Sequence, residues 1–190
     1  MIPRDTIETP RLRLVASAHV TAFETLDYFQ RNRAHFAPWD PPIPQDFLSL
    51  VGQARRVEQS IADFRLGAGF RYWIVLREHE RRIIGQCNFS QVARGPFQSA
   101  MLGYSVDRAH EGQGIMREAL DAALDEVFSE RCMLHRVQAN VRPENRRSIA
   151  LLERLRFERE GLARNYLFID GAWRDHVNFA KLNPNEQPPP

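Results

Sequence analysis

Hydrophobic residues recur along the first third of the chain with the spacing of an alternating strand followed by amphipathic helices. Residues 11–15 alternate and predict a strand, and residues 18–36 place apolar side chains at helical intervals without a glycine or proline. Four prolines within residues 37–44 exclude regular structure there, because proline lacks an amide donor and fixes φ. A second helix is predicted over residues 45–66 and is ended by residues 67–69, Gly-Ala-Gly.

The rest of the chain continues with further strands and helices. A wide apolar stripe over residues 114–129 predicts a helix that packs on a sheet, and residues 145–155 predict a short helix. Asp170-Gly171 predicts a tight hairpin between the last two strands. The predicted strands are 70–76, 83–92 (joined by the charged, exposed loop 77–82), 101–106, 136–141, 161–169 and 173–181.

These elements predict one α/β domain over residues 9–182, with a central mixed, mostly antiparallel sheet of about seven strands and about four flanking helices. We expect the proline-rich tail, residues 183–190, to be disordered. No repeat or internal domain boundary interrupts the pattern.

Composition restricts the possible functions. A chain of 190 residues with 43% hydrophobic residues suffices for one well-buried domain. A net charge of +2 and the lack of a basic-aromatic stripe argue against direct nucleic-acid binding. There is no apolar run of membrane-spanning length and no signal-peptide pattern, so we expect a cytoplasmic protein without membrane contact. Cys87 and Cys132 stand alone, and the histidines lack metal-ligand spacing, so we expect no disulfide and no metal site.

Residues 102–120 are the most informative segment, since they predict a strand, a glycine-containing turn and a helix in succession. That order gathers unpaired amide groups at the helix N-terminus, where the helix dipole adds positive potential. Gly112 and Gly114 carry no side chain to keep an anion from the backbone. The segment therefore predicts either a diphosphate-binding turn or a purely structural turn.

Two familiar phosphate-binding motifs are excluded. No lysine-hydroxyl pair follows the glycines, as a P-loop requires. Arg117 occupies the place of the third glycine in a dinucleotide-binding fingerprint, and the turn lies past the middle of the chain.

Seven fragments resemble, in order, the GCN5-related N-acetyltransferase (GNAT) superfamily, and specifically its branch that acetylates ribosomal-protein N-termini. They are Thr9-Pro-Arg-Leu12, Pro38-Trp-Asp-Pro41, Ile84-Gly-Gln-Cys-Asn-Phe-Ser90, Leu102-Gly-Tyr-Ser105, Gly112-Gln-Gly-Ile-Met116, Asn145-Arg-Arg-Ser148 and Ile169-Asp-Gly-Ala-Trp-Arg-Asp-His-Val177. Two positions depart from the family pattern. Ala109 replaces a usual polar residue of the turn, and Arg156 replaces a usual glycine after the short helix. A left-handed Arg156 would cost roughly 1–2 kcal/mol.

The resemblance implies acetyl-CoA as co-substrate and no metal. It implies that the backbone of Tyr104, Ser105 and Val106 binds the pantetheine arm, with an amide near Val106 stabilising the oxyanion. The amides from Gly112 to Met116 would hold the diphosphate. The remaining cofactor-binding candidates within or beside the turn and the short helix are Arg108, Gln113, Ile115 and Asn145, with Arg117 and Arg146 as further candidates for the adenosine-side phosphate. Asn145 has N-capping as its alternative role.

For catalysis, the resemblance places Ser148 near the thioester sulfur, where its hydroxyl could protonate the departing thiolate. Tyr166 is the rival acid. Asp107 and Glu111 are weak candidates for the general base, and Cys87 is a poor nucleophile because no activating partner is visible.

Trp39, Asn88 and Phe97 are candidates for binding the acceptor, which the resemblance implies is a protein N-terminus such as that of a small-subunit ribosomal protein. Two alternatives stay open. One is an acetyltransferase for a small amine such as an amino sugar, polyamine or antibiotic, and the other is a non-catalytic, ribosome-associated binding module.

Overall fold

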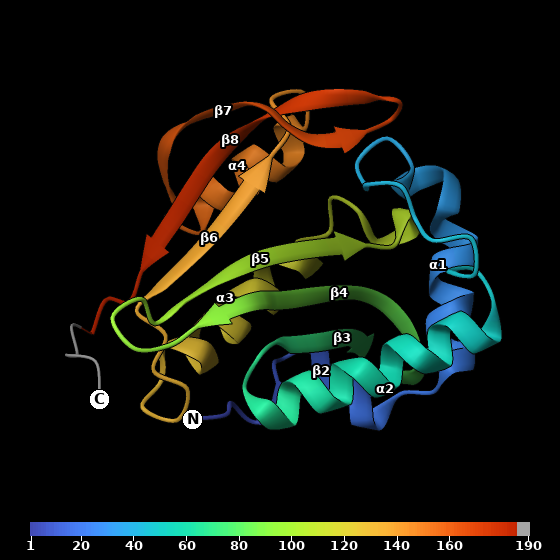
Figure 1. The fold of residues 1–190 in the computed structure, drawn as a ribbon. Coiled ribbons are helices and arrows are strands. Elements are labelled where there is room, and N and C mark those ends of the chain that lie inside the picture. The colour runs from blue at the N-terminus through green and yellow to red at the C-terminus, as the bar shows by residue number, and fades with distance from the viewer. Residues whose placement is uncertain (186–190) are drawn as a thin grey trace.

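The computed structural model describes residues 1–185, apart from the side chain of Glu80, and shows one eight-stranded sheet with helices on both faces (Figure 1). The strands are β1 (Thr6–Glu8), β2 (Leu12–Ala16), β3 (Phe70–Leu76), β4 (His79–Ala93), β5 (Ser99–Val106), β6 (Arg136–Val141), β7 (Glu158–Ile169) and β8 (Ala172–Leu182). The helices are α1 (Ala22–Phe36), α2 (Leu50–Leu66), α3 (Ile115–Phe128) and α4 (Arg146–Arg154), with short 3-10 turns η1 (Ser17–His19) and η2 (Arg108–His110).

The sheet order is β1-β2-β3-β4-β5-β6-β8-β7, and β5-β6 is the parallel pair while the other neighbouring pairs are antiparallel. This confirms the predicted mixed, mostly antiparallel sheet and its four helices. The structure adds one strand, β1, which pairs with β2 at the sheet edge. Three residues without apolar alternation give no strand signal in the sequence.

A hydrophobic core lies on each face of the sheet. The larger core joins α3 and α4 to the strands, and the predicted stripe of α3 is buried along its length. The smaller core packs α1 on the opposite face around Tyr28, Phe29 and Trp73. Phe23 is one of the apolar residues in the predicted helix 18–36, but it is 72% exposed, because the buried face of α1 passes through Thr25, Tyr28 and Phe29.

Both early helices begin later than predicted, because a side chain caps each start. Thr21 and Glu24 form a capping box, in which the Glu24 amide donates to Thr21 Oγ1 (3.2 Å) and the Thr21 amide donates to Glu24 Oε2 (2.7 Å). Ser49 caps α2 by accepting from the Gly52 amide at 3.0 Å, so residues 45–48 form a turn rather than helix.

Other boundaries also differ from the prediction. β4 starts at His79, so Arg77 and Glu78 alone connect it to β3 in place of the predicted loop 77–82. Asp170 and Gly171 have φ of 51° and 72° and join β7 to β8 as the predicted tight turn.

The described part of the predicted tail is anchored at its start. Asn183 is buried and donates to the carbonyl oxygens of Phe128 (2.9 Å) and Leu134 (3.0 Å). Residues 186–190 lie outside the described part, so disorder of the tail stays a prediction. No helix within residues 1–185 is long and apolar enough to cross a membrane.

Candidate active site

The centre of the sheet contains a gap between its two parallel strands. β5 and β6 pair over three positions, from Ser99–Arg136 to Met101–Gln138. In the described chain, no pairing joins β5 from Leu102 onward to the remainder of β6, and the two strands diverge in Figure 1. β5 stays paired with β4 on its other edge as far as Val106. On this edge the backbone groups of β5 beyond Met101 are therefore not paired with a neighbouring strand, and an extended molecule could bond to them like an added strand. We call this unpaired region between β5 and β6 the slot.

The glycine turn, which contains Gly112 and Gly114, lies between the end of β5 at Val106 and the start of α3 at Ile115. Gly112 and Gly114 have φ of 73° and 75°, a conformation that glycine adopts without strain. Gly114 is the N-cap of α3, and no side chain caps this helix end. The first amides of the helix are therefore available to a ligand. A Cβ atom added to Gly112 would meet nothing within 4 Å, so the space beside this residue is open, whereas one added to Gly114 would lie 3.6 Å from Arg11 Nη2.

An arginine from the start of β2 braces the turn. Arg11 Nη1 donates to the Gln113 carbonyl oxygen (3.1 Å), and Arg11 Nε donates to Glu118 (2.7 Å). Thr9 Oγ1 also donates to Glu118 (2.6 Å). Partial burial alone would raise the pKa of Glu118, but these hydrogen bonds and the Arg11 charge outweigh it and keep that pKa below its usual value. The turn is thus held in shape, with a guanidinium beside it.

The other predicted cofactor residues around the turn have distinct placements. Ile115 and Met116 bury their side chains in the core and so fix the helix start. Gln113 is exposed and donates to the Ala109 carbonyl oxygen (2.9 Å). The side chain of Arg108 is exposed, while its amide donates to Asn32 Oδ1 (3.1 Å).

On the β5 side of the slot, Tyr104 meets the short helix α4. Its hydroxyl lies 2.5 Å from Ser148 Oγ. Burial raises the pKa of Tyr104 to about 12, although the hydrogen bond with Ser148 opposes this. The phenol is therefore protonated at neutral pH and can donate to Ser148, which leaves the serine proton available to a group in the slot.

Asn145 caps α4, since its Oδ1 accepts from the Ser148 amide at 3.1 Å. The structural alternative is therefore present, and the pantetheine contact of Asn145 stays a prediction. The cap also fixes Ser148 in the first turn of the helix, opposite Tyr104.

Tyr166 of β7, the rival acid, lies beside β6, the strand opposite β5 across the slot. Its hydroxyl accepts from Asn140 Nδ2 of β6 (2.9 Å), and its ring packs against His176 with centroids 5.4 Å apart. The two candidate acids are thus held by different strands, Ser148 beside β5 and Tyr166 beside β6.

The side chain of Ser105 points to the α1 face of the sheet, away from Tyr104. Its Oγ lies 2.9 Å from the Tyr28 hydroxyl and accepts from Gln86 Nε2 at 3.2 Å. Burial raises the pKa of Tyr28. No local sequence pattern relates α1 to β5, so the sequence did not predict this hydrogen-bonded group.

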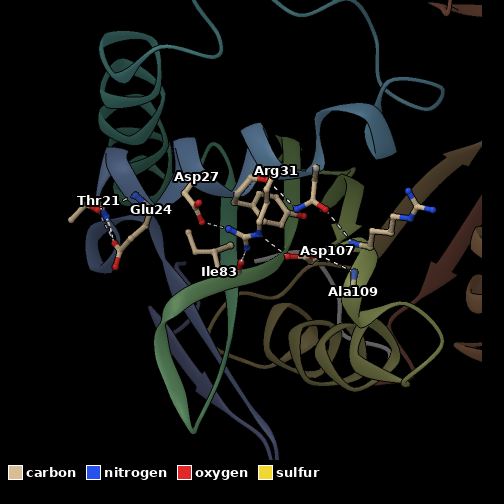
Figure 2. A network of polar contacts seen from close by, with 10 residues as sticks. Thr21, Glu24, Asp27, Arg31, Ile83, Asp107 and Ala109 are labelled. Carbon is tan, nitrogen blue, oxygen red and sulfur yellow. Dashed lines mark hydrogen bonds and ion pairs between the residues drawn. The ribbon is translucent and has the colours of Figure 1, made fainter.

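Asp107 is a structural residue rather than a base. Figure 2 shows Arg31 of α1 reaching Asp107, Asp27 and the Ile83 carbonyl oxygen, with Arg31 Nε 2.7 Å from Asp107. Asp107 also accepts from the Ala109 amide at 3.0 Å. Burial would raise the pKa of Asp107, but the bonds to Arg31 and this amide outweigh burial and lower it. The network joins α1 to the segment that leads into the turn.

Two other reactive candidates are Glu111, which is held in an ion pair, and Cys87, which is a buried thiol. Glu111 forms an ion pair with Arg147 and lies 3.5 Å from His35 Nε2. Cys87 and Cys132 are buried and form no disulfide, and burial raises the pKa of Cys87 to about 12. Cys87 is therefore a thiol rather than a thiolate at neutral pH and is a poor nucleophile.

The three acceptor candidates do not form one group. Trp39 lies in the loop after α1, with the Arg142 guanidinium 5.5 Å from its ring, so this loop reaches the end of β6. Asn88 lies on β4 and pairs with Gly103 of β5, next to Tyr104. Phe97 is 69% exposed in the turn that precedes β5, at the opposite end of that strand from Val106 and the glycine turn.

Comparison with known proteins agrees with this geometry. The profile of the family described as "Acetyltransferase (GNAT) domain" matches residues 11–158. The chain is 38% identical, over 98% of its length and 95% of the relative's, to the [ribosomal protein uS5]-alanine N-acetyltransferase of Escherichia coli (strain K12).

Solved structures show the same fold. The ribosomal-protein-S5-alanine acetyltransferase of Vibrio fischeri superposes with a TM-score of 0.89 at 34% identity, covering 96% of this chain and 99% of the other. Mycobacterium smegmatis RimJ in complex with CoA-disulfide superposes with a TM-score of 0.85 at 30% identity, covering 100% and 93%. The chain therefore belongs to the GNAT acetyltransferases and is an acetyl-CoA-dependent N-acetyltransferase.

Proposed function

We propose that this protein transfers the acetyl group of acetyl-CoA to the N-terminal α-amine of a ribosomal protein, with the alanine N-terminus of uS5 as the first candidate. The observation that carries the proposal is the near full-length similarity to the uS5-alanine N-acetyltransferase of E. coli. The slot between β5 and β6, ending at the open glycine turn, gives the proposal a physical site.

The turn and the slot have the features that this co-substrate requires. Amides from Gly112 to Met116 would bind the diphosphate, and the unpaired edge of β5 from Tyr104 to Val106 would bind the pantetheine arm. An amide of β5 near Val106 would stabilise negative charge on the carbonyl oxygen during transfer. When bound, acetyl-CoA supplies an acetyl group activated as a thioester.

Transfer then proceeds by direct attack in a ternary complex. The amine nitrogen bonds to the acetyl carbon, and the bond from that carbon to sulfur breaks. Ser148 donates its proton toward the departing sulfur while it accepts from the Tyr104 hydroxyl. The proton released by the amine leaves through water, since Asp107 and Glu111 are held in ion pairs, and water returns a proton to Ser148.

The chemistry of the acceptor explains why no dedicated base is needed. An α-amine has a pKa of about 8, so deprotonating it at pH 7 costs roughly 1.4 kcal/mol. A lysine amine costs roughly 4–5 kcal/mol. The site therefore favours an N-terminus over a lysine side chain.

The test offers labelled acetyl-CoA and three acceptors to the purified protein. These are a peptide with the N-terminal sequence of uS5, the same peptide with its α-amine blocked and its lysines intact, and a panel of amino sugars and polyamines. We expect label on the first peptide alone. Transfer restricted to the small amines would overturn the proposal in favour of a small-molecule acetyltransferase, and a lack of CoA binding would favour a non-catalytic module.

A further inference from the structure

A polar pocket of about 300 Å³ lies on the face of the sheet covered by α2. Its walls come from α2 and from strands β3 and β4. Among the lining residues are Arg56 and Asp63 of α2, Arg71 of β3, and Asn88 and Ser90 of β4. A cavity lined by so many polar groups suits a polar ligand better than it suits packing.

Arg71 is one of two arginines that line this pocket. Its guanidinium lies 5.7 Å from the Trp73 ring and donates to Gln86 Oε1. Throughout residues 1–185, no carboxylate with a described side chain lies within ion-pair distance of Arg71, and its other N–H groups have no partner. Burial lowers the pKa of Arg71 to about 10, and the charge of Arg56 adds to this effect while the charge of Asp63 opposes it. A pKa of about 10 leaves Arg71 a cation at neutral pH.

Arg56 and Asp63 are the other charged residues that line the pocket. The Arg56 guanidinium lies 4.5 Å from the Phe47 ring. Burial lowers the pKa of Arg56, and the negative charge of Asp40 opposes this effect. Asp63 also lines the pocket, where it accepts from Gln59 Nε2 at 2.8 Å without contacting Arg71. Arg71 therefore lines the pocket with a guanidinium that has unused donors, and such a group binds a carboxylate best.

The pocket is lined by β4, which pairs with β5, the strand that borders the slot. Arg71, Asn88 and Gly103 are in register across β3, β4 and β5. Neighbouring strands lie about 4.8 Å apart, so the backbone of Arg71 lies about 10 Å from that of Gly103. A hydrogen-bonded chain also runs from Arg71 through Gln86 to Ser105 on β5. A peptide advances about 3.3 Å per residue, so one whose amine reacts beside β5 reaches the pocket with its third or fourth residue.

We infer that this pocket selects acceptors with an acidic side chain at the third or fourth position, with Arg71 as the group that binds the carboxylate. The inference rests on the proposed function, since it assumes a peptide acceptor. In this inference Arg71 is a specificity residue, and the positive charge of Arg56 adds to the electrostatic potential in the pocket.

The experiment measures steady-state transfer to matched peptides that begin with alanine and carry one Glu, moved from position 2 to position 5, or Gln in its place. For the wild-type protein we expect KM to be about 10-fold lower for Glu than for Gln at position 3 or 4, because a hydrogen bond to a charged group contributes that much or more. Arg71→Gln should remove the preference and leave kcat for the Gln peptides nearly unchanged.

Arg55→Gln is the matched control, because Arg55 lies on α2 outside the pocket, where it pairs with Asp46 at 2.9 Å. This variant should keep the full preference. If Arg71→Gln does not fold, Arg56→Gln should reduce the preference about two- to three-fold. Equal KM values for Glu and Gln peptides in the wild-type protein, or an unchanged preference in Arg71→Gln, would overturn the inference.

Failure of the proposed function gives a different result. If no peptide is acetylated, the proposed function is wrong. Calorimetric titration with the same peptides then tests whether the pocket binds the acidic side chain. Tighter binding of the Glu peptides that Arg71→Gln abolishes would then support the pocket, and equal binding would contradict it.

Discussion

Replacing Gly112 by alanine separates the strain of the glycine turn from its binding role. Gly112 has a φ of 73°, where alanine costs roughly 1–2 kcal/mol of unfolding free energy. The added methyl group meets no protein atom within 4 Å, so no clash adds to this cost. It enters the open space before the amides, where we place the diphosphate.

Gly171→Ala provides a control with the same backbone cost. Gly171 has a φ of 72°, and an added Cβ there also meets nothing within 4 Å. Gly171 lies in the β7–β8 turn, apart from the slot. Both variants should therefore lose about the same stability, roughly 2–4 °C of Tm for each kcal/mol.

The two variants should differ in their affinity for CoA. Losing one charge-assisted hydrogen bond to the diphosphate costs about 1.5–3 kcal/mol, which corresponds to a Kd about 10- to 100-fold weaker. Calorimetric titration with CoA should show this loss for Gly112→Ala and an unchanged Kd for Gly171→Ala. An equal Kd for the two variants would refute the placement of the diphosphate at this turn.

Four further predictions come from other contacts. Arg156 has a φ of 61°, as expected from its replacement of a glycine, so Arg156→Gly should raise the unfolding free energy by about 1 kcal/mol in a urea titration, and an unchanged midpoint would contradict this. Ser148→Ala should lower kcat about 100-fold and Tyr104→Phe somewhat less, with the Kd for CoA nearly unchanged. The pH profile of kcat/KM should rise through about pH 8 with the substrate amine, since Tyr104, with a pKa of about 12, does not titrate in that range; a profile set by an acidic group near pH 5 would indicate a general base. Asp107→Asn should destabilise the protein at pH 7 by about 1–3 kcal/mol. Because the pKa of Asp107 is lowered on folding, its stabilising effect is present above the unfolded pKa of about 3.9 and is lost as pH falls through the folded pKa, so the two proteins should converge in acid unfolding; a constant difference would contradict this.

Local signals explain the parts of the fold that were predicted correctly. A two-residue hairpin turn of this kind requires positive φ at both turn residues, and Asp-Gly is one of the few dipeptides that favour it. Asp170 and Gly171 both have positive φ in the structure. The stripe on α3 identified a buried helix because eight apolar positions recur at helical spacing and all eight are buried. The capping box of Thr21 and Glu24 was also readable from the sequence, but the apolar pattern before it led to a start at residue 18.

The contacts that complete the site join residues far apart in the chain. Arg11 and Glu118 brace the turn across 107 positions, and Tyr28 reaches Ser105 across 77. No periodicity or local motif encodes such pairs, because they arise only when α1 and β2 pack around β5 and α3. The sequence also did not single out Arg71 for a related reason, since an arginine in an apolar strand is visible in the sequence but the pocket that it lines is visible only in the structure.

Hydrogen–deuterium exchange with and without CoA tests most directly whether backbone amides, rather than side chains, hold the co-substrate. CoA should slow exchange at the amides of residues 112–116 and at alternate amides of residues 102–106, with little change in the β7–β8 hairpin. Unchanged exchange at the glycine turn under saturating CoA, or protection confined to another surface, would contradict the site described above.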